Sequence, residues 1–301
     1  KIAARHNFVD SPGGAQDVED TDGHGTHVAG LIAANSALLT GIAPEASVIP
    51  LRIAKETQVS LILKNTLNPA LQWVLDNHKA HTITAVNLSF GGGNWQTGDE
   101  FIAATTMLNQ AAAPVLIDLF KQLRGKNIAV VVSAGNDYPG SEGMAFPAIV
   151  PYCISVGSVF DADIGSFSID NGRFIAFSTA AGRITPYSQR LHKPDDAQKP
   201  YTTVFAPGSI ATSAGIIGNN QSVDKNGTSQ AAPVITGLIL LMQELYMRNN
   251  GGKLPPVDKL VEWLRKGGET IKDGDDEKDN VKHTDKEYVR IDALKALQAV
   301  Q

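Results

Sequence analysis

A run of small and β-branched apolar residues, Ala129-Val130-Val131-Val132, constrains the fold of this chain more than any other feature. Runs of this kind, closed by a Gly-containing turn, are typical of parallel strands that are buried on both faces. Similar runs at residues 48–53, 85–90, 154–159 and 204–206 alternate with helix-forming segments at residues 24–34, 69–77, 105–123, 229–247 and 257–266, and a terminal helix follows Asp292. We expect Pro114 to break or kink the third of these helices. Alternating strands and helices predict an α/β fold with a mostly parallel sheet.

The composition narrows the class of protein. With 301 residues, 43% of them hydrophobic, residues 1–301 suit one large α/β domain. A net charge of −5 argues against nucleic acid as a partner, and no apolar run is long enough to span a membrane, so no membrane partner is expected. The single cysteine, Cys153, excludes an intramolecular disulfide. It lies in an apolar run with no histidine motif around it, which argues against a cysteine peptidase.

Three segments place reactive side chains where polar loops meet apolar elements. His24 and His27 begin a small-residue apolar stretch and share a helix face. Asn136 follows the valine run, and Ser229 stands at the start of a long apolar helix. Each has an ordinary structural alternative: a capping serine, a turn asparagine, and capping or zinc-binding histidines. Zinc is disfavoured because the other five histidines form no ligand motif. The same positions suit a nucleophile at a helix N-terminus, a base and an oxyanion donor.

Taken in order, these segments resemble the motifs of the subtilisin-like serine peptidases (subtilases). The family's motifs for its catalytic histidine, its oxyanion asparagine and its nucleophile correspond here to His24-Gly25-Thr26-His27-Val28-Ala29-Gly30, Ala134-Gly135-Asn136 and Gly227-Thr228-Ser229-Gln230-Ala231-Ala232-Pro233. Further similar segments are Gly41-Ile42-Ala43-Pro44, Asn87-Leu88-Ser89-Phe90-Gly91-Gly92, Phe146-Pro147-Ala148 and Ala206-Pro207-Gly208. The resemblance spans about residues 24–241. It implies a three-layer α/β sandwich with a mostly parallel central sheet.

The resemblance also implies a serine endopeptidase that hydrolyses peptide bonds through an acyl-enzyme. Ser229 is then the nucleophile, His24 the general base and acid, and Asn136 a donor to the oxyanion. The substrate cleft is expected to be lined by Ser89, Phe90, Gly91, Ser133, Ala134 and Gly135. These small residues predict a slot with an apolar or broad preference for peptide or protein substrates. Catalysis of this kind needs no cofactor, and no clear motif supports a structural calcium ion.

The aspartate that orients the histidine in such a site is not visible in this sequence. In the family it ends the first core strand, in an apolar-Asp-Ser/Thr-Gly sequence well before the histidine, whereas only 23 residues precede His24. Three interpretations compete. The aspartate strand lies upstream of Lys1 or on a separate chain, or the protein is an inactive relative that acts as a binding module, or a local carboxylate replaces the aspartate. The local candidates are Asp10, Asp17, Glu19, Asp20 and Asp22. The first interpretation is favoured because the three other motifs are intact.

Two further segments carry expectations of their own. Residues 160–203 are long and polar, and we expect an insertion there, a surface excursion rather than a loop that shapes substrate or binds a partner. The acidic stretch from Asp273 to Asp279 fails the calcium-loop pattern of EF-hands and is expected to be a solvated loop. The family resemblance favours a secreted or extracytoplasmic location.

Overall fold

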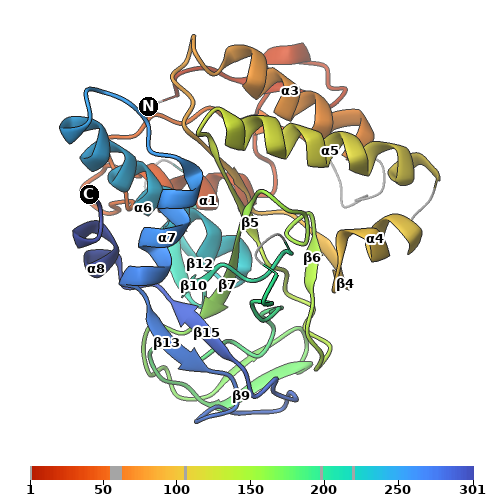
Figure 1. The fold of residues 1–301 in the computed structure, drawn as a ribbon, viewed down its shortest axis with the longest axis vertical. Helices are drawn as coiled ribbons and strands as arrows, with labels where there is room; N and C mark the ends of the chain where they lie inside the picture. Colours follow the sequence, from red (N-terminus) through yellow and green to blue (C-terminus); the bar gives the residue numbers. More distant parts are fainter. Residues whose placement is uncertain (1, 55–62, 105–106, 197–198, 219–220) are drawn as a thin grey trace.

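The computed structural model describes residues 2–54, 63–104, 107–196, 199–218 and 221–301 (Figure 1). Its central sheet has six strands: β3 (Ala85–Leu88), β5 (Ala129–Ser133), β7 (Ile154–Val159), β10 (Val204–Pro207), β13 (Glu269–Lys272) and β15 (Glu287–Arg290). They lie in the order β13-β15-β10-β7-β5-β3. All neighbours from β3 to β15 are parallel, and only β13 pairs antiparallel within this sheet. The sheet is therefore mostly parallel, as the sequence predicted.

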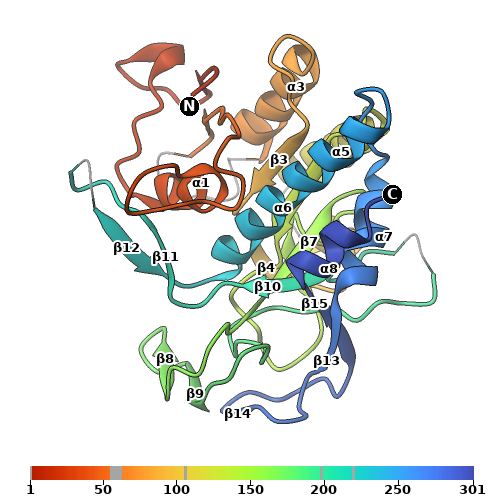
Figure 2. The ribbon, with the colours of Figure 1, turned by 90° about the vertical axis from the view of Figure 1, so that its left-hand side faces the viewer.

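Strand β5 divides the core into two layers because its side chains alternate between the faces of the sheet. All five of its residues are buried. Val130 and Val132 join a cluster formed with α3 (Asn68–Asn77) and α5 (Met107–Gly125). Ala129 and Val131 join a second cluster formed with α6 (Thr228–Asn249) and α7 (Val257–Gly267). Figures 1 and 2 show these helix pairs on opposite sides of the sheet. The fold is thus a three-layer α/β sandwich.

The remaining helices extend these two outer layers. Helix α1 (His24–Ala33) packs on α6, and α8 (Ala293–Gln298) packs on α7. Asp292 caps α8 by accepting a hydrogen bond from the Lys295 amide at 3.0 Å, as expected. Helix α4 (Gly98–Ala104) contacts α5, a 3-10 turn η1 spans Gly14–Gln16, and a π-helical turn η2 (Leu63–Leu67) precedes α3. Within the described ranges, no helix is both long and apolar enough to cross a membrane.

Four smaller sheets surround the central one. Two of them are pairs of antiparallel strands, β4 (Gly92–Trp95) with β6 (Met144–Phe146) and β11 (Ala211–Ala214) with β12 (Ser222–Lys225). The others are the parallel pair β1 (His6–Asn7) and β2 (Leu51–Arg52), and the three strands β8 (Phe167–Ile169), β9 (Phe174–Ser178) and β14 (Lys278–Asp279). Strands β8 and β9 lie in the segment predicted to be an insertion. In the part of the chain that the structure describes, no strand pairs with the edge of β3 away from β5.

Helix α5 corrects one prediction. It runs from Met107 through Pro114 to Gly125, so the predicted break is wrong, while residues 105 and 106 of the predicted helix lie outside the described residues. Pro114 is exposed, so water can satisfy the carbonyl that a proline ring leaves without its helical partner.

The acidic stretch after β13 is not uniformly solvated, which corrects a second prediction. Asp275 and Asp276 are exposed, but the Asp273 side chain is 0% exposed and forms an ion pair at 2.8 Å with Arg190, which is itself 1% exposed. Asp273 also accepts hydrogen bonds from the Thr284 amide and hydroxyl, both at 2.7 Å. A carboxylate buried in this way joins the C-terminal hairpin to the body of the protein.

Candidate active site

Helix α1 begins at His24 because aspartate side chains satisfy its first amides. Asp20 Oδ1 accepts from the Gly23 amide at 2.8 Å, and its Oδ2 accepts from the Thr26 amide at 2.7 Å. Asp22 accepts from the His24 amide at 3.1 Å. Gly23 adopts φ +83°, a conformation that favours glycine. Burial raises the pKa of Asp20, but the hydrogen bonds from Thr26, Gly23 and Asp22 outweigh it, so this pKa lies below its ordinary value.

The His24 imidazole is held in its neutral form. Its partial burial lowers the pKa, and the positive charge of Lys225 lowers it further. The carboxylates of Asp22 and Asp20 act in the opposite direction and only partly offset these effects. A histidine with a pKa below its usual value is unprotonated at neutral pH, which is the state that a general base requires.

His27 is buried and bonded to the β11–β12 pair. Its side chain is buried, and its Nε2 lies 2.9 Å from the Ala211 carbonyl and 3.1 Å from the Val223 carbonyl. Two carbonyl acceptors require Nε2 to carry the proton. Because Ser213 also donates to the His27 carbonyl at 2.8 Å, α1 and the β11–β12 pair are joined at three points. Of the two histidines singled out in the sequence, His27 is thus the one that joins α1 to the neighbouring strands.

Metal and thiol chemistry find little support in the described residues. No three His, Cys, Asp or Glu side chains among them are grouped so as to hold a metal ion. Cys153 precedes β7 and packs against the first core cluster, where burial raises the pKa of its thiol to about 12. A thiol with such a pKa is protonated at neutral pH and is a poor nucleophile.

Ser229 is the second residue of α6, directly after the helix start. Gly227 precedes the helix with φ +145°, which favours glycine, and its amide donates to the Gly208 carbonyl at 2.8 Å. The Ser229 hydroxyl makes one long hydrogen bond, 3.4 Å to the Ser89 carbonyl, while the Ser89 hydroxyl donates to the Ser229 carbonyl at 2.7 Å. The free amides and the dipole of the helix start favour negative charge at this point.

The orientation of the Asn136 amide is fixed by its neighbour in the nucleophile loop. Its Oδ1 accepts from the Thr228 amide at 2.8 Å and from the Thr228 hydroxyl at 2.9 Å. That hydroxyl accepts in turn from the Gly135 amide at 3.0 Å. Because the Asn136 oxygen is engaged, its Nδ2 faces the opposite way and is available to donate. The structure brings Asn136 into contact with Thr228, the residue before Ser229, and this contact explains the orientation of its amide.

Residues 89–91 and 133–135, which were predicted to line the cleft, both lie next to Ala145, a residue that the sequence analysis did not single out. A Cβ on Gly91 would lie 3.2 Å from the Ala145 Cβ, and a Cβ on Gly135 would lie 2.8 Å from it. Ala145, in β6, thus bounds the slot, and its amide donates to the Ala134 carbonyl at 2.7 Å. Ser133 and Ala134 are buried, so a substrate would meet this segment through Gly135 and the backbone. The slot residues Ser89 and Phe90 are half-buried.

The Gln189 side chain packs against Gly135 of the slot. Its side-chain Nε2 donates to the Gly93 carbonyl at 2.9 Å and to Asn94 Oδ1 at 2.6 Å. A Cβ on Gly135, which has φ +113°, would lie 1.8 Å from Gln189 Oε1. Glycine is therefore required at position 135 both for its conformation and for the space it leaves. Gln189 belongs to none of the motifs found in the sequence, and nothing near it indicates its contact with Gly135.

Two contacts of a complete catalytic site are not formed among the described residues. No hydrogen bond joins the His24 ring to the Ser229 hydroxyl, and no carboxylate binds the His24 ring. Of the local candidates, Asp20 and Asp22 bind backbone amides of α1, and Asp17 pairs with Arg52 at 3.2 Å. These three aspartates thus have partners other than the His24 ring.

Similarity to known proteins agrees with this geometry. The model of the Subtilase family (peptidase S8) matches residues 3–259. The major intracellular serine protease of Bacillus subtilis (strain 168) is 26% identical over 88% of this chain and 69% of its own length. Subtilisin E of the same organism is 28% identical over 80% of this chain, and the match covers 52% of its own length. An extracellular serine proteinase of Thermus sp. (strain Rt41A) is 27% identical, over 78% of this chain and 44% of its own length. The chain thus spans about half the length of the last two relatives. The names of the three relatives include both an intracellular and an extracellular enzyme.

Solved structures share the fold. The prenylagaramide maturation protease PagA superposes with a TM-score of 0.61 at 20% identity, covering 99% of this chain and 86% of PagA. The PatG macrocyclase in complex with peptide superposes with a TM-score of 0.57 at 20% identity, covering 82% of this chain and 60% of PatG. At these identities the likeness concerns the fold alone.

Proposed function

This chain belongs to the subtilase family, and we propose on that basis that it supplies the nucleophile, base and oxyanion donor of a serine endopeptidase. The observation that carries the proposal is the contact between Asn136 and Thr228. It fixes a side-chain donor beside the first turn of α6, where Ser229 stands. An amide whose orientation is set before the substrate arrives is what stabilisation of a developing oxyanion requires.

The proposed reaction uses three side chains. Ser229 Oγ attacks the carbonyl carbon of a peptide bond while His24 accepts the hydroxyl proton. The negative charge on the former carbonyl oxygen is stabilised by Asn136 Nδ2 and the Ser229 amide. His24 then gives its proton to the leaving amine, the C–N bond breaks, and an ester to Ser229 forms. Water, deprotonated by His24, hydrolyses this ester and restores the hydroxyl.

We further propose that an additional strand carries the aspartate and pairs with the open edge of β3. Leu51 of β2 and Val86 of β3 pack against the same core cluster, although the two strands belong to different sheets. A strand between them would join the sheets and pair backbone groups that are otherwise unpaired. Ser89 and Asn136 follow the carboxyl ends of β3 and β5. A residue at the carboxyl end of a parallel neighbour of β3 would therefore lie at the same edge as His24 and Ser229.

Labelling with a fluorophosphonate tests the nucleophile. We expect the protein to be labelled at Ser229, and the Ser229→Ala variant to remain unlabelled. To test the strand, an N-terminal segment with the apolar-Asp-Thr-Gly pattern is fused to the chain, and the matched control carries Asn in place of Asp. The Asp fusion should hydrolyse an unstructured protein about 10⁴-fold faster than the Asn fusion, the size of the effect of the triad aspartate in serine peptidases.

The alternative is an inactive subtilase fold that binds peptides without cleaving them. It is favoured if a correctly folded Asp fusion neither reacts with the fluorophosphonate nor hydrolyses any unstructured protein. Equal labelling of the protein and of its Ser229→Ala variant would show that another residue reacts, and would refute the assignment of the nucleophile.

A further inference from the structure

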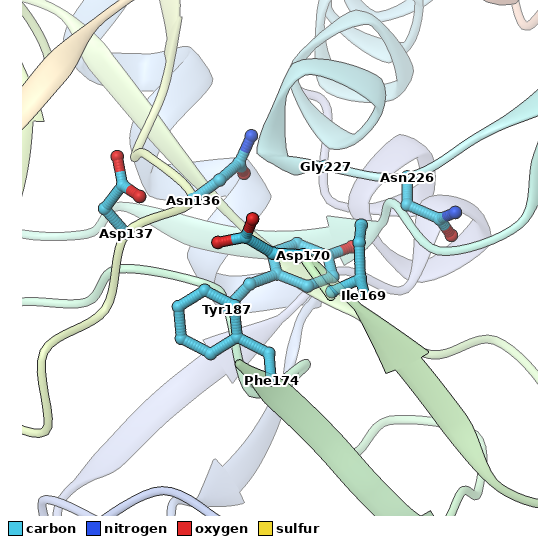
Figure 3. A pocket seen from close by; sticks show the side chains of 8 residues that line it. All are labelled: Asn136, Asp137, Ile169, Asp170, Phe174, Tyr187, Asn226 and Gly227. Carbon is cyan, nitrogen blue, oxygen red and sulfur yellow. The ribbon is translucent and has the colours of Figure 1, made fainter. Parts of the chain in front are cut away.

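A cavity of about 270 Å³ adjoins the proposed oxyanion site. Asn136 and Gly227 contribute to one side of it, and Ile169, Asp170 and Phe174 of the β8–β9 hairpin contribute to another. Figure 3 shows the Asp170 side chain between Asn136 and Asn226, beside the ring of Tyr187. The cavity therefore connects the catalytic loops with the segment predicted to be an insertion.

The cavity is distinct from the slot predicted for the residue that precedes the scissile bond. That slot is bounded by Gly91, Gly135 and Ala145, and none of them lines the cavity. The two depressions share only the neighbourhood of Asn136, where the carbonyl oxygen of the scissile bond would lie. The cavity lies on the other side of that oxygen from the slot. It therefore faces the part of the substrate after the scissile bond, which leaves with the amine.

The turn of the β8–β9 hairpin brings Asp170 to the rim of the cavity. Ile169 pairs with Phe174, and the turn between them contains Asp170, Asn171 and Gly172, with φ values of +55°, +53° and +86°. Aspartate, asparagine and glycine tolerate this conformation better than other residues. The Arg173 amide donates to the Asp170 carbonyl at 3.0 Å and closes the turn.

The hairpin is firmly attached to the body of the protein, so the cavity is formed before a ligand binds. Phe174 and Tyr187 are buried in one aromatic cluster with Phe160 and Phe167. The Asn280 side chain, after β14, accepts from the Ile175 amide at 2.8 Å and donates to the Arg173 carbonyl at 3.0 Å. The rings of Phe174 and Tyr187 give the cavity an apolar, rigid wall.

Two carboxylates, those of Asp137 and Asp170, and one guanidinium, that of Arg173, lie at the rim of the cavity. Arg173 Nη1 lies 2.9 Å from Asp137 Oδ1 and 3.3 Å from Asp170 Oδ2. One guanidinium thus serves two carboxylates, and its carbon lies 4.7 Å from the centre of the Phe174 ring. The carboxylates are half-exposed, at 60% and 54%, and each keeps an oxygen that Arg173 does not contact. A second cation can therefore bind at this rim.

We propose that this cavity is a subsite for a lysine or arginine side chain of the substrate, on the leaving-amine side of the scissile bond. The proposal rests on the proposed peptidase function. The aliphatic stem of such a side chain would lie against Phe174 and Tyr187, and its charged end would reach Asp137 and Asp170. An apolar side chain could fill the same volume but would leave the carboxylates without a new partner.

Hydrolysis of internally quenched peptides tests the subsite. The peptides are identical except that lysine, norleucine or glutamate occupies one of the first three positions after the scissile bond. At one of these positions we expect kcat/KM to be about three- to fivefold higher for lysine than for norleucine, because half-exposed charge pairs are weak, and lowest for glutamate. The preference for lysine should decrease with added salt.

Variants assign the preference to the rim. Asp170→Asn keeps a residue suited to the turn and should bring the lysine and norleucine rates close together, while Asp170→Lys should favour glutamate. Asp161→Asn is the matched control, because it removes an exposed carboxylate from the same segment outside the cavity and should leave the preference unchanged. Equal rates for lysine and norleucine at all three positions, in an active enzyme, would overturn the subsite and leave the peptidase function standing.

A binding measurement decides the proposal even without turnover. The Ser229→Ala variant is titrated with the same peptides carrying a fluorescent label, and their anisotropy is recorded. We expect the lysine peptide to bind about threefold more tightly than the norleucine peptide, and Asp170→Asn in the Ser229→Ala background to remove the difference. If the two peptides bind equally well before Asp170 is changed, the cavity is not a cation subsite.

Discussion

Replacing Asp273 with alanine is expected to lower the free energy of unfolding by about 3–5 kcal/mol, the usual cost of leaving a buried charge without its partner. The Asp273 carboxylate is fully buried and pairs with Arg190 at 2.8 Å. It also accepts hydrogen bonds from Thr284 and lies 2.9 Å from His283 Nδ1. The alanine variant would retain Arg190 at 1% exposure, with the Ser188 carbonyl and the Tyr138 ring as its remaining direct side-chain contacts among the described residues.

Calorimetry converts this cost into a change of melting temperature. Unfolding entropies of about 2 cal/mol/K per residue correspond to about 0.6 kcal/mol/K for a chain of this length. The expected decrease in Tm is therefore about 5–8 °C. Asp275→Ala is the control because Asp275 is exposed on the same loop, and it should change stability by no more than about 0.5 kcal/mol.

The pH dependence provides a second test. Burial raises the pKa of Asp273, but the charge of Arg190 and the hydrogen bonds from Thr284 and His283 outweigh it, so the pKa in the folded protein is below 3.8. A lowered pKa means that the stabilisation is present above the pKa of the unfolded chain and is lost as pH falls through that of the folded protein. The difference in Tm should thus narrow in acid. If Asp273→Ala and Asp275→Ala melt within 1 °C of each other at pH 7, the reasoning is wrong.

Three further changes test the site. Asn136→Asp keeps an acceptor for Thr228 but removes the donor, so kcat in initial-rate assays of the Asp-strand fusion should fall about 10²–10³-fold, with little change in KM; an unchanged kcat would contradict the role of Asn136. Lys225→Met removes a charge that lowers the pKa of His24, so the acidic limb of the kcat/KM profile should move to higher pH; a shift to lower pH would refute this. Asp20→Ala should destabilise the protein by about 1–2 kcal/mol in denaturant unfolding, as expected for a lost helix cap, and unchanged stability would show that water replaces it.

The layered fold could be predicted because its signals are local. The valine run of β5 indicated burial on both faces, and the structure places Val130 and Val131 in two different core clusters. The extent of β2 was harder to predict: within the expected strand of residues 48–53, Leu51 and Arg52 form the ladder with β1, while Val48 makes only an isolated bridge to Ile2. Strand ends depend on the partner strand, which a single segment does not reveal.

Long-range contacts account for what the sequence did not predict. The acidic stretch was expected to be solvated because it reads as a run of charges without a calcium-loop pattern, and the buried partner of Asp273, Arg190, is 83 positions away. Ala145 and Gln189 were missed for the same reason, since their role in the slot arises only from contact with Gly135. Asp20 was not marked by a capping pattern either, because the N-cap position is Gly23 and Asp20 stands three residues before it.

The position of β5 has a consequence for hydrogen exchange. Amides of a strand that is paired on both edges and buried on both faces exchange only when the whole domain opens. Asn136 follows this strand, and α6, whose second residue is Ser229, packs directly on it. The two groups proposed to meet the substrate carbonyl are therefore attached to the slowest-exchanging unit of the protein, whereas β3, one edge of which no described strand covers, should exchange faster than β5. A ligand strand that binds this edge would then be detected as slower exchange in β3, with little change in β5.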